Sequence, residues 1–234
     1  MTLSGETIDY GPCAFMDAYD PATVFSSIDS GGRYAYGNQP YIGAWNLARL
    51  AESLLPLLHE DTEAAVKLAE NELASFDDYF QAAWLQGMRG KLGLFGEQPD
   101  DEALIQRLLE LMQLHQADFT NTFLALTFGR LEEPAMAGTP EWASWLEQWK
   151  TRLSAQEQSR EASRQLMLSS NPAVIPRNHR VEEALEAAVE RDDYTVMHRL
   201  LSVLSAPYAH TGEQAEYTGL PPACDRPYRT FCGT

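Results

Sequence analysis

Apolar residues recur at intervals of three and four positions along most of the chain after residue 41. This spacing places them on one face of an α-helix, so the pattern predicts a succession of amphipathic helices. The first of these carries its apolar face on Leu47, Leu50, Ala51, Leu54, Leu55 and Leu58. We expect this face to point into the core of a domain.

The second predicted helix begins at a cap formed by Asp61 or Thr62 and ends around Gly87 and Gly90. Its apolar positions are Ala65, Leu68, Ala69, Leu73, Phe76, Phe80 and Trp84. Further helices are expected over about 101–112 and 118–126, from Pro140 onward, and over residues 181–189 and 196–204. The helix after Pro140 places Trp142, Trp145 and Trp149 on one side, which is more typical of a core than of a ligand-stacking surface.

Segments without this periodicity separate the predicted domains. Residues 1–41 are rich in Gly, Pro, Ser and Asp, with strand-like pieces at Glu6–Tyr10 and Arg33–Tyr36. Residues 154–164 are polar and form either an exposed helix or a connector, which Asn171-Pro172 ends. After Pro207 we expect a non-helical tail, because three more prolines follow. We therefore divide the chain into 1–41, a helical body at 42–205, and a tail at 206–234.

Composition narrows the class of protein further. The formal net charge of −17 argues against a nucleic-acid partner, because phosphate binding requires clustered Lys and Arg. There is no apolar stretch of about 18 residues and no leader-like start, so we expect neither a membrane partner nor secretion, and a cytoplasmic location. Three widely spaced cysteines do not form a disulfide framework, and the five histidines lack the spacing of a metal-binding helix pair.

The run Asp9-Tyr10-Gly11-Pro12 is the strongest candidate for chemistry. Asp, Gly and Pro in close succession are typical of a tight turn, in which Asp caps backbone amides and Gly supplies a positive φ. Asp-aromatic-Gly is also how protein kinases present a carboxylate that binds a metal ion. From these four residues alone, both interpretations stay open.

A longer set of residues resembles the selenoprotein O family, also called the YdiU family, of protein adenylyltransferases. The resemblance is carried at the front by residues 7–12, 15–21, 32–36, 38–40 and 45–51, and near the end by Asn171-Pro172, residues 176–179, Pro207-Tyr208, residues 220–222 and Cys232. The residues from about 60 to 165 are less diagnostic. Matches in the same order at both ends make a chance resemblance improbable.

The resemblance implies the C-terminal, large lobe of a protein-kinase-like fold, without the N-terminal nucleotide lobe. It implies ATP as substrate, Mg²⁺ or Mn²⁺ as cofactor, and transfer of AMP to Ser, Thr or Tyr hydroxyls of proteins. Asp9 would bind the metal and thereby the ATP, while the proton-acceptor Asp would precede Met1. The fragment is then expected to be inactive without the missing N-terminal lobe. The alternative is a non-catalytic helical interaction module derived from the same lobe.

Five further residues carry weaker hypotheses. Asp17 and Asp20 are close enough to Asp9 for a second metal, although Asp next to Pro is ordinary turn chemistry. The resemblance also implies a redox pair between a cysteine after Asp-Tyr-Gly and Cys232. Phe25 occupies the first of those positions here, so the family's pairing cannot form. Cys13 could take its place only if the tail reaches the motif. Arg33 falls in the activation-segment-like region, where it is a candidate to meet an acidic group.

Overall fold

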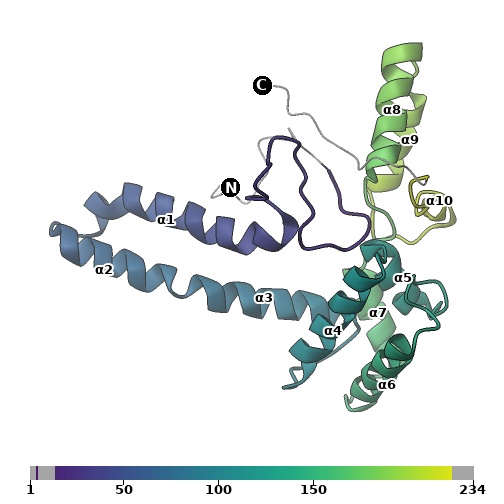
Figure 1. The fold of residues 1–234 in the computed structure, drawn as a ribbon, viewed down its shortest axis with the longest axis horizontal. Helices are drawn as coiled ribbons and strands as arrows, with labels where there is room; N and C mark the ends of the chain where they lie inside the picture. The colour runs from purple at the N-terminus through teal and green to yellow at the C-terminus, as the bar shows by residue number, and fades with distance from the viewer. Residues whose placement is uncertain (1–3, 5–13, 223–234) are drawn as a thin grey trace. The chain divides into compact units, whose positions relative to one another are not determined.

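The computed structural model describes residue 4 and residues 14–222 and is mainly α-helical, as predicted (Figure 1). Its helices are η1 (Tyr36–Asn38), α1 (Gln39–Leu58), α2 (Thr62–Leu73), α3 (Phe76–Lys91), α4 (Asp101–Leu114), α5 (Phe119–Phe128), α6 (Pro140–Ser154), α7 (Arg160–Ser170), α8 (Asn178–Arg191), α9 (Thr195–Leu204) and α10 (Gly212–Ala215). The β-structure of the described residues is a single antiparallel bridge between Ala18 and Asp118. None of the described helices has the length and apolar character that a membrane crossing requires.

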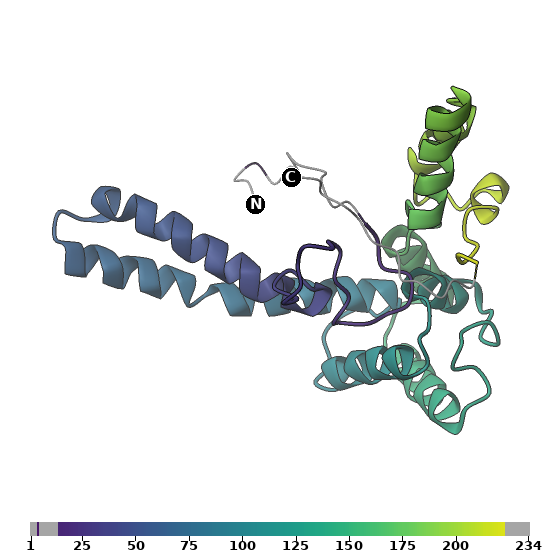
Figure 2. The same cartoon turned by 45° about the horizontal axis from the view of Figure 1, so that its top comes forward.

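The chain forms two compact units, and α3 passes from the first into the second. The first unit contains Pro21–Leu85, in which α1 and α2 lie side by side as an antiparallel hairpin (Figures 1 and 2). Asp61 caps α2 by accepting a hydrogen bond from the Ala64 amide at 2.8 Å, which confirms one of the two predicted caps.

The predicted core-facing character of the first helix is wrong in one respect. The leucines of α1 do face α2, but no residue of α1 is buried in the described part of the chain. Leu54 is 37% exposed and Leu58 is 42% exposed. A two-helix hairpin has only one neighbour for each apolar face, so the hairpin alone cannot exclude solvent from these side chains.

The second predicted helix is two helices in the structure. A turn at Ala74 and Ser75 separates α2 from α3, and the Ser75 hydroxyl donates to the Glu72 carbonyl at 3.0 Å. Such side-chain bonds compete with the helical ladder, which explains a break that contains neither Gly nor Pro. The strand-like reading of Arg33–Tyr36 is also wrong, because these residues form turns that lead into η1.

The second unit contains Ala14–Asp20 and residues 86–222. Its core includes the predicted tryptophan stripe: Trp142, Trp145 and Trp149 are all buried, and neighbouring rings stack with centroids 5.3 and 5.9 Å apart. The indole N–H of Trp145 donates to the Leu104 carbonyl at 2.8 Å, which joins α6 to α4. The interpretation of this stripe as core is therefore confirmed.

The polar stretch after Ser154 contains both of the predicted alternatives. Residues 155–159 form a connector, and α7 begins after Ser159, whose hydroxyl accepts from the Ala162 amide at 3.1 Å. Helix α7 ends at Ser170, before Asn171-Pro172, as expected.

The tail differs from the prediction of a non-helical segment, because α10 forms there as one turn held by a capping box between Thr211 and Gln214. The division at residues 41 and 205 stays a prediction.

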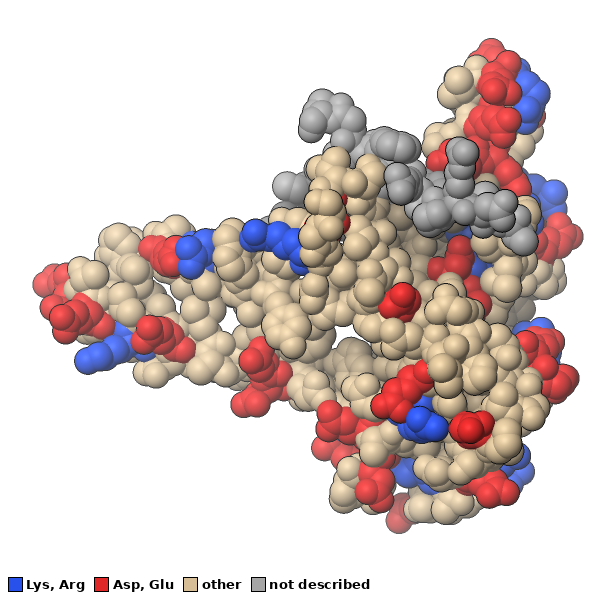
Figure 3. Space-filling model, in the orientation of Figure 1, with Lys and Arg blue, Asp and Glu red and all other residues tan. Residues whose placement is uncertain are grey.

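Acidic side chains are more numerous than basic ones on the face drawn in Figure 3. They are spread over several helices, in agreement with the formal charge of −17. Several of them form i,i+3 pairs on single helices, such as Arg180 with Glu183 and Arg107 with Glu110. Exposed pairs of this kind contribute little to stability. Most acidic side chains of the described helices are exposed, so the acidity belongs mainly to a solvated helical surface.

Candidate functional site

The principal predicted site residues, Asp9, Cys13 and Cys232, lie outside the described residues. The described residues closest to Asp9 on its C-terminal side form the segment Ala14–Asp20, which belongs to the second unit. We call this stretch the post-motif segment. The contacts of the post-motif segment are the part of the candidate site that the structure describes.

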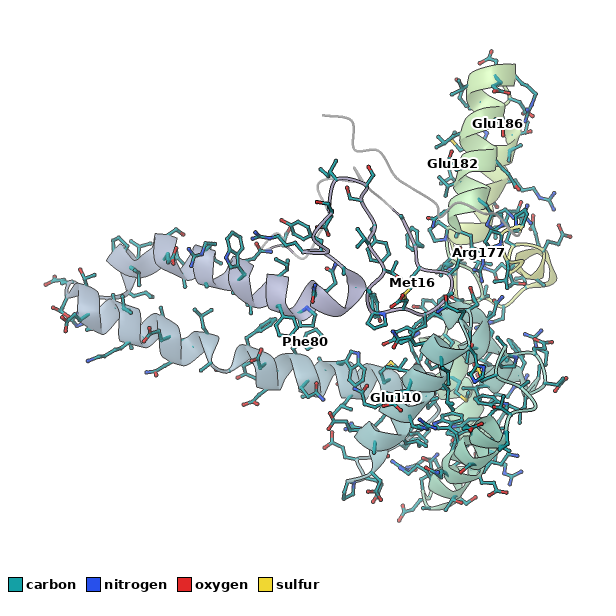
Figure 4. All side chains as sticks on the ribbon, viewed as in Figure 1. Met16, Phe80, Glu110, Arg177, Glu182 and Glu186 are labelled. Carbon is teal, nitrogen blue, oxygen red and sulfur yellow. The ribbon has the colours of Figure 1, made fainter. Side chains whose placement is uncertain are left out.

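One buried arginine connects the post-motif segment to α5. Arg177 is 1% exposed, and its Nη1 donates to Asp17 Oδ1 at 2.5 Å and to Asp118 Oδ2 at 2.8 Å. Its Nη2 donates to Asp118 Oδ1 at 3.0 Å and to Asn121 Oδ1 at 3.1 Å. Figure 4 labels Arg177 at the base of α8 and Met16 on the neighbouring segment. The planar guanidinium suits this arrangement because it presents several donors in a fixed fork.

The neighbouring carboxylates favour the charged form of Arg177. Burial by itself lowers the pKa of Arg177, but hydrogen bonding and charge from Asp118, together with those from Asp17, outweigh burial and raise that pKa. One cation thus faces two carboxylates. Asp118 also caps α5, because its Oδ1 accepts from the Asn121 amide at 2.7 Å. The same carboxylate therefore orients a helix and binds the arginine.

Asn178 holds the backbone of the post-motif segment. Its Oδ1 accepts from the Phe15 amide at 2.9 Å, and its Nδ2 donates to the Phe15 carbonyl at 2.8 Å. A side-chain amide that bonds both backbone groups of one residue replaces the partner that a neighbouring strand would supply. Asn178 is the first residue of α8 and directly follows Arg177, so one helix start contributes both anchors.

Main-chain hydrogen bonds complete the attachment. The Tyr19 amide donates to the Ala117 carbonyl at 2.9 Å, and the Phe119 amide donates to the Asp17 carbonyl at 2.8 Å. These bonds form the bridge between the post-motif segment and the start of α5. The segment is therefore fixed through side chains and backbone at positions 15, 17 and 19.

A second buried polar cluster lies where α3, α5 and α7 end. Lys91 Nζ donates to the Ser170 carbonyl at 3.1 Å and lies 5.3 Å from the centre of the Phe123 ring. Burial lowers the pKa of Lys91. Asn171, 1% exposed, donates to the Lys91 carbonyl at 2.9 Å and to Thr127 Oγ1 at 3.0 Å. Asn171 therefore links the ends of α3 and α5 from its position directly after α7.

The weaker site hypotheses have mixed outcomes. Asp17 serves as an ion-pair partner of Arg177, and Asp20 accepts from Gln113 Nε2 at 3.3 Å. Within the described residues, no group of three or more His, Cys, Asp or Glu side chains could hold a metal ion. The guanidinium of Arg33 lies 4.7 Å from the centre of the Trp45 ring, and no ion pair joins it to a carboxylate in the described part of the chain. The second-metal hypothesis for Asp17 and Asp20 thus gains no support.

Residues 1–205 match the family described as "Protein adenylyltransferase SelO". The chain belongs to the SelO family. This confirms the family resemblance that the sequence shows near both ends of the chain. The SelO match covers both the Asp9 motif and the residues that anchor the post-motif segment.

Relatives of this SelO chain are named "Protein nucleotidyltransferase YdiU". Those from Alkaliphilus metalliredigens and Brevibacillus brevis are 63% and 65% identical over 234 residues. The relative from Clostridium botulinum is 60% identical over the same length. Each alignment covers 100% of this chain and 48% of the relative, so the chain spans about half the length of these proteins. Nucleotidyl transfer is the activity that their names state.

Sequence reasoning included Arg177 and Asn178 in the family resemblance but assigned them no role. Their partners Asp17 and Phe15 are 160 and 163 positions away in the sequence. The available signal was the position of Arg177-Asn178 between a proline and the start of a predicted helix. That signal indicates a helix start and does not identify the segment that the helix start binds.

Proposed function

We propose that this chain is the C-terminal part of a protein adenylyltransferase and forms the large lobe of a kinase-like fold. The complete enzyme would transfer AMP from ATP to Ser, Thr or Tyr hydroxyls of proteins. The hydroxyl oxygen attacks the α-phosphorus, the bond to the β-phosphate oxygen breaks, and pyrophosphate leaves. The hydroxyl proton passes to an Asp that lies outside this chain. The chain alone is therefore proposed to be inactive.

In this proposal Asp9 is the metal ligand that the chain supplies. A carboxylate is a hard oxygen ligand suited to Mg²⁺ or Mn²⁺. The bound cation would neutralise the triphosphate charge, which is the main electrostatic requirement of such transfers. Asp17 is committed to Arg177, so the remaining protein ligands would come from the missing half of the enzyme.

The observation that supports this proposal best is the attachment of the post-motif segment. A metal ligand must be held within about 0.5 Å of its productive position, and the supporting contacts decide whether it is. Arg177, Asn178 and the bridge at Ala18 fix the chain within about ten residues of Asp9.

The test is Asp9→Asn in the full-length protein, with AMP incorporation measured from labelled ATP at saturating Mg²⁺ or Mn²⁺. We expect a loss of at least about a hundredfold, typical for removal of a main electrostatic group. Asp192→Asn is the matched control, because Asp192 is exposed and has a φ of 52°, which Asn tolerates. Unchanged incorporation by Asp9→Asn would exclude the metal role.

A second candidate function is a non-catalytic helical interaction module. It is favoured by the α1–α2 groove, an apolar cavity of about 460 Å³ lined by residues that include Leu50, Leu54, Leu58, Leu68 and Phe76. Exposed apolar surfaces of this kind commonly bind protein partners. A full-length protein that incorporates no AMP with either cation would favour this function, whereas incorporation that depends on Asp9 would exclude it.

A further inference from the structure

A pocket of about 560 Å³ in the second unit is lined by residues of α5, α6 and α7 and of the segments next to them. Its volume falls within the range of about 300–1,000 Å³ that is typical of small-molecule sites. All the described residues that line it belong to the second unit. Among the described residues that line it, none belongs to the group formed by Arg177, Asp17, Asp118 and Asn121.

The floor of this pocket is apolar. Leu126, Trp149 and Met167 are 3%, 6% and 4% exposed and come from three different helices. The indole N–H of Trp149 already donates to the Leu92 carbonyl at 2.9 Å. What Trp149 offers the pocket is therefore hydrocarbon surface. A ligand that binds here must carry an apolar body to use this floor.

The rim of the pocket is cationic. Lys150, Arg160 and Arg164 line it, and no lining residue is acidic. This bias is unusual in a chain with 34 acidic and 17 basic residues. Arg160 and Arg164 are one turn apart on α7, so they project on the same side of the helix.

These three cations keep most of their capacity for a ligand. Arg164 approaches Glu161 only at 4.0 Å, in an exposed i,i+3 pair. Among the described residues, no ion pair involves Lys150 or Arg160. An anion at the rim would therefore meet positive charge that the protein does not already neutralise.

We propose that this pocket binds a small amphipathic anion, such as a medium-chain carboxylate. The aliphatic body lies against Leu126, Trp149 and Met167, and the acidic head meets Lys150, Arg160 and Arg164. We propose this site as separate from the AMP transfer, because no described residue that lines it is Arg177, Asn178 or a member of the post-motif segment. A ligand that has only one of the two features would lack either the apolar contacts of the floor or the charge contacts of the rim.

The experiment is calorimetric titration of the 234-residue protein with octanoate. We expect saturable binding, with octanamide and acetate binding at least about tenfold more weakly, because each lacks one of the two recognised features. Absence of saturable octanoate binding, or equal binding of octanamide, would overturn the proposal. Vesicles of anionic phospholipid distinguish a free ligand from a membrane lipid: co-sedimentation without octanoate binding would also overturn it.

A matched pair of variants tests the location of the site. Arg160→Gln combined with Arg164→Gln should weaken octanoate binding roughly tenfold, since two partly exposed charge contacts are removed. Arg107→Gln combined with Arg191→Gln removes the same charge outside the pocket and should leave binding within about twofold. Both double variants should keep the helical circular dichroism of the parent. Equal weakening by the two pairs would show a general charge effect and would contradict this site.

Discussion

Arg177 and Asp118 form a buried two-point ion pair, in which Nη1 and Nη2 of the arginine meet the two carboxylate oxygens at 2.8 and 3.0 Å. The arginine comes from the start of α8 and the aspartate from the cap of α5. Asp17 adds a second carboxylate on Nη1. This geometry joins the post-motif segment to the starts of α5 and α8 within the second unit.

Arg177→Met should destabilise the protein by about 3–5 kcal/mol, because Asp17 and Asp118 would lose their cation while staying partly or fully buried. Arg177→Lys keeps the charge but loses the fork, so we expect an intermediate loss. The free energy of unfolding in urea measures both. Arg191→Met, on the exposed end of α8, is the control and should change stability by no more than about 0.5 kcal/mol. A similar effect from Arg177→Met and Arg191→Met would contradict the role of the ion pair.

Asn178→Ala should release the backbone of Phe15, since both hydrogen bonds of its side chain to that residue are lost. We expect a stability loss of about 1–3 kcal/mol. If the proposed function is correct, AMP incorporation by the full-length variant should also fall severalfold at a temperature where it stays folded. Asn71→Ala, at an exposed position of α2, serves as the comparison and should alter neither quantity appreciably. Normal stability in Asn178→Ala would show that the post-motif segment is held by other contacts.

His179 gives a pH dependence whose direction is fixed. Burial, reinforced by the charge of Arg180, lowers the pKa of His179 below its ordinary value of 6.5. The folded state therefore prefers the neutral ring, so the contribution of His179 to stability is fully present above about pH 6.5 and declines as the pH falls toward the folded-state pKa. Between pH 7.5 and 5.0, the parent should lose more stability than His179→Gln. An NMR titration of the His179 ring with a midpoint above 6.5 would refute this prediction.

Substitutions at Gly93 and Gly96 distinguish the stability cost of close packing from the stability cost of backbone strain. Both have a positive φ, of 71° and 67°. A Cβ on Gly93 would lie 2.9 Å from the Ser163 carbonyl oxygen and 3.0 Å from the Met167 side chain, whereas a Cβ on Gly96 would meet nothing within 4 Å. Gly96→Ala should cost about 1–2 kcal/mol, from the left-handed conformation alone. Gly93→Ala should cost at least about 1 kcal/mol more, measured by urea unfolding, because atoms must also shift. Equal stability costs for the two substitutions would show that Ser163 and Met167 of α7 move away from the added methyl group without a measurable penalty.

Much of the local structure followed from periodicity. The predicted starts at Asp101 and Pro140 coincide with those of α4 and α6, and the tryptophan stripe is buried as expected. The break between α2 and α3 was not predictable in the same way, because no helix-breaking residue marks it. The face of α1 was misjudged for a different reason: the pattern identifies an apolar face but does not say how many neighbours will cover it.

By itself, the sequence determined the helical class, most helix limits and the SelO family, because each depends on residues that are close together or occur in a fixed order. Only the tertiary structure decided that Arg177 binds Asp17 and Asp118, and that Asn178 holds Phe15. These partners are between 59 and 163 positions apart. Which distant groups meet is set by how the helices pack, and neither propensity nor spacing along the chain contains that information.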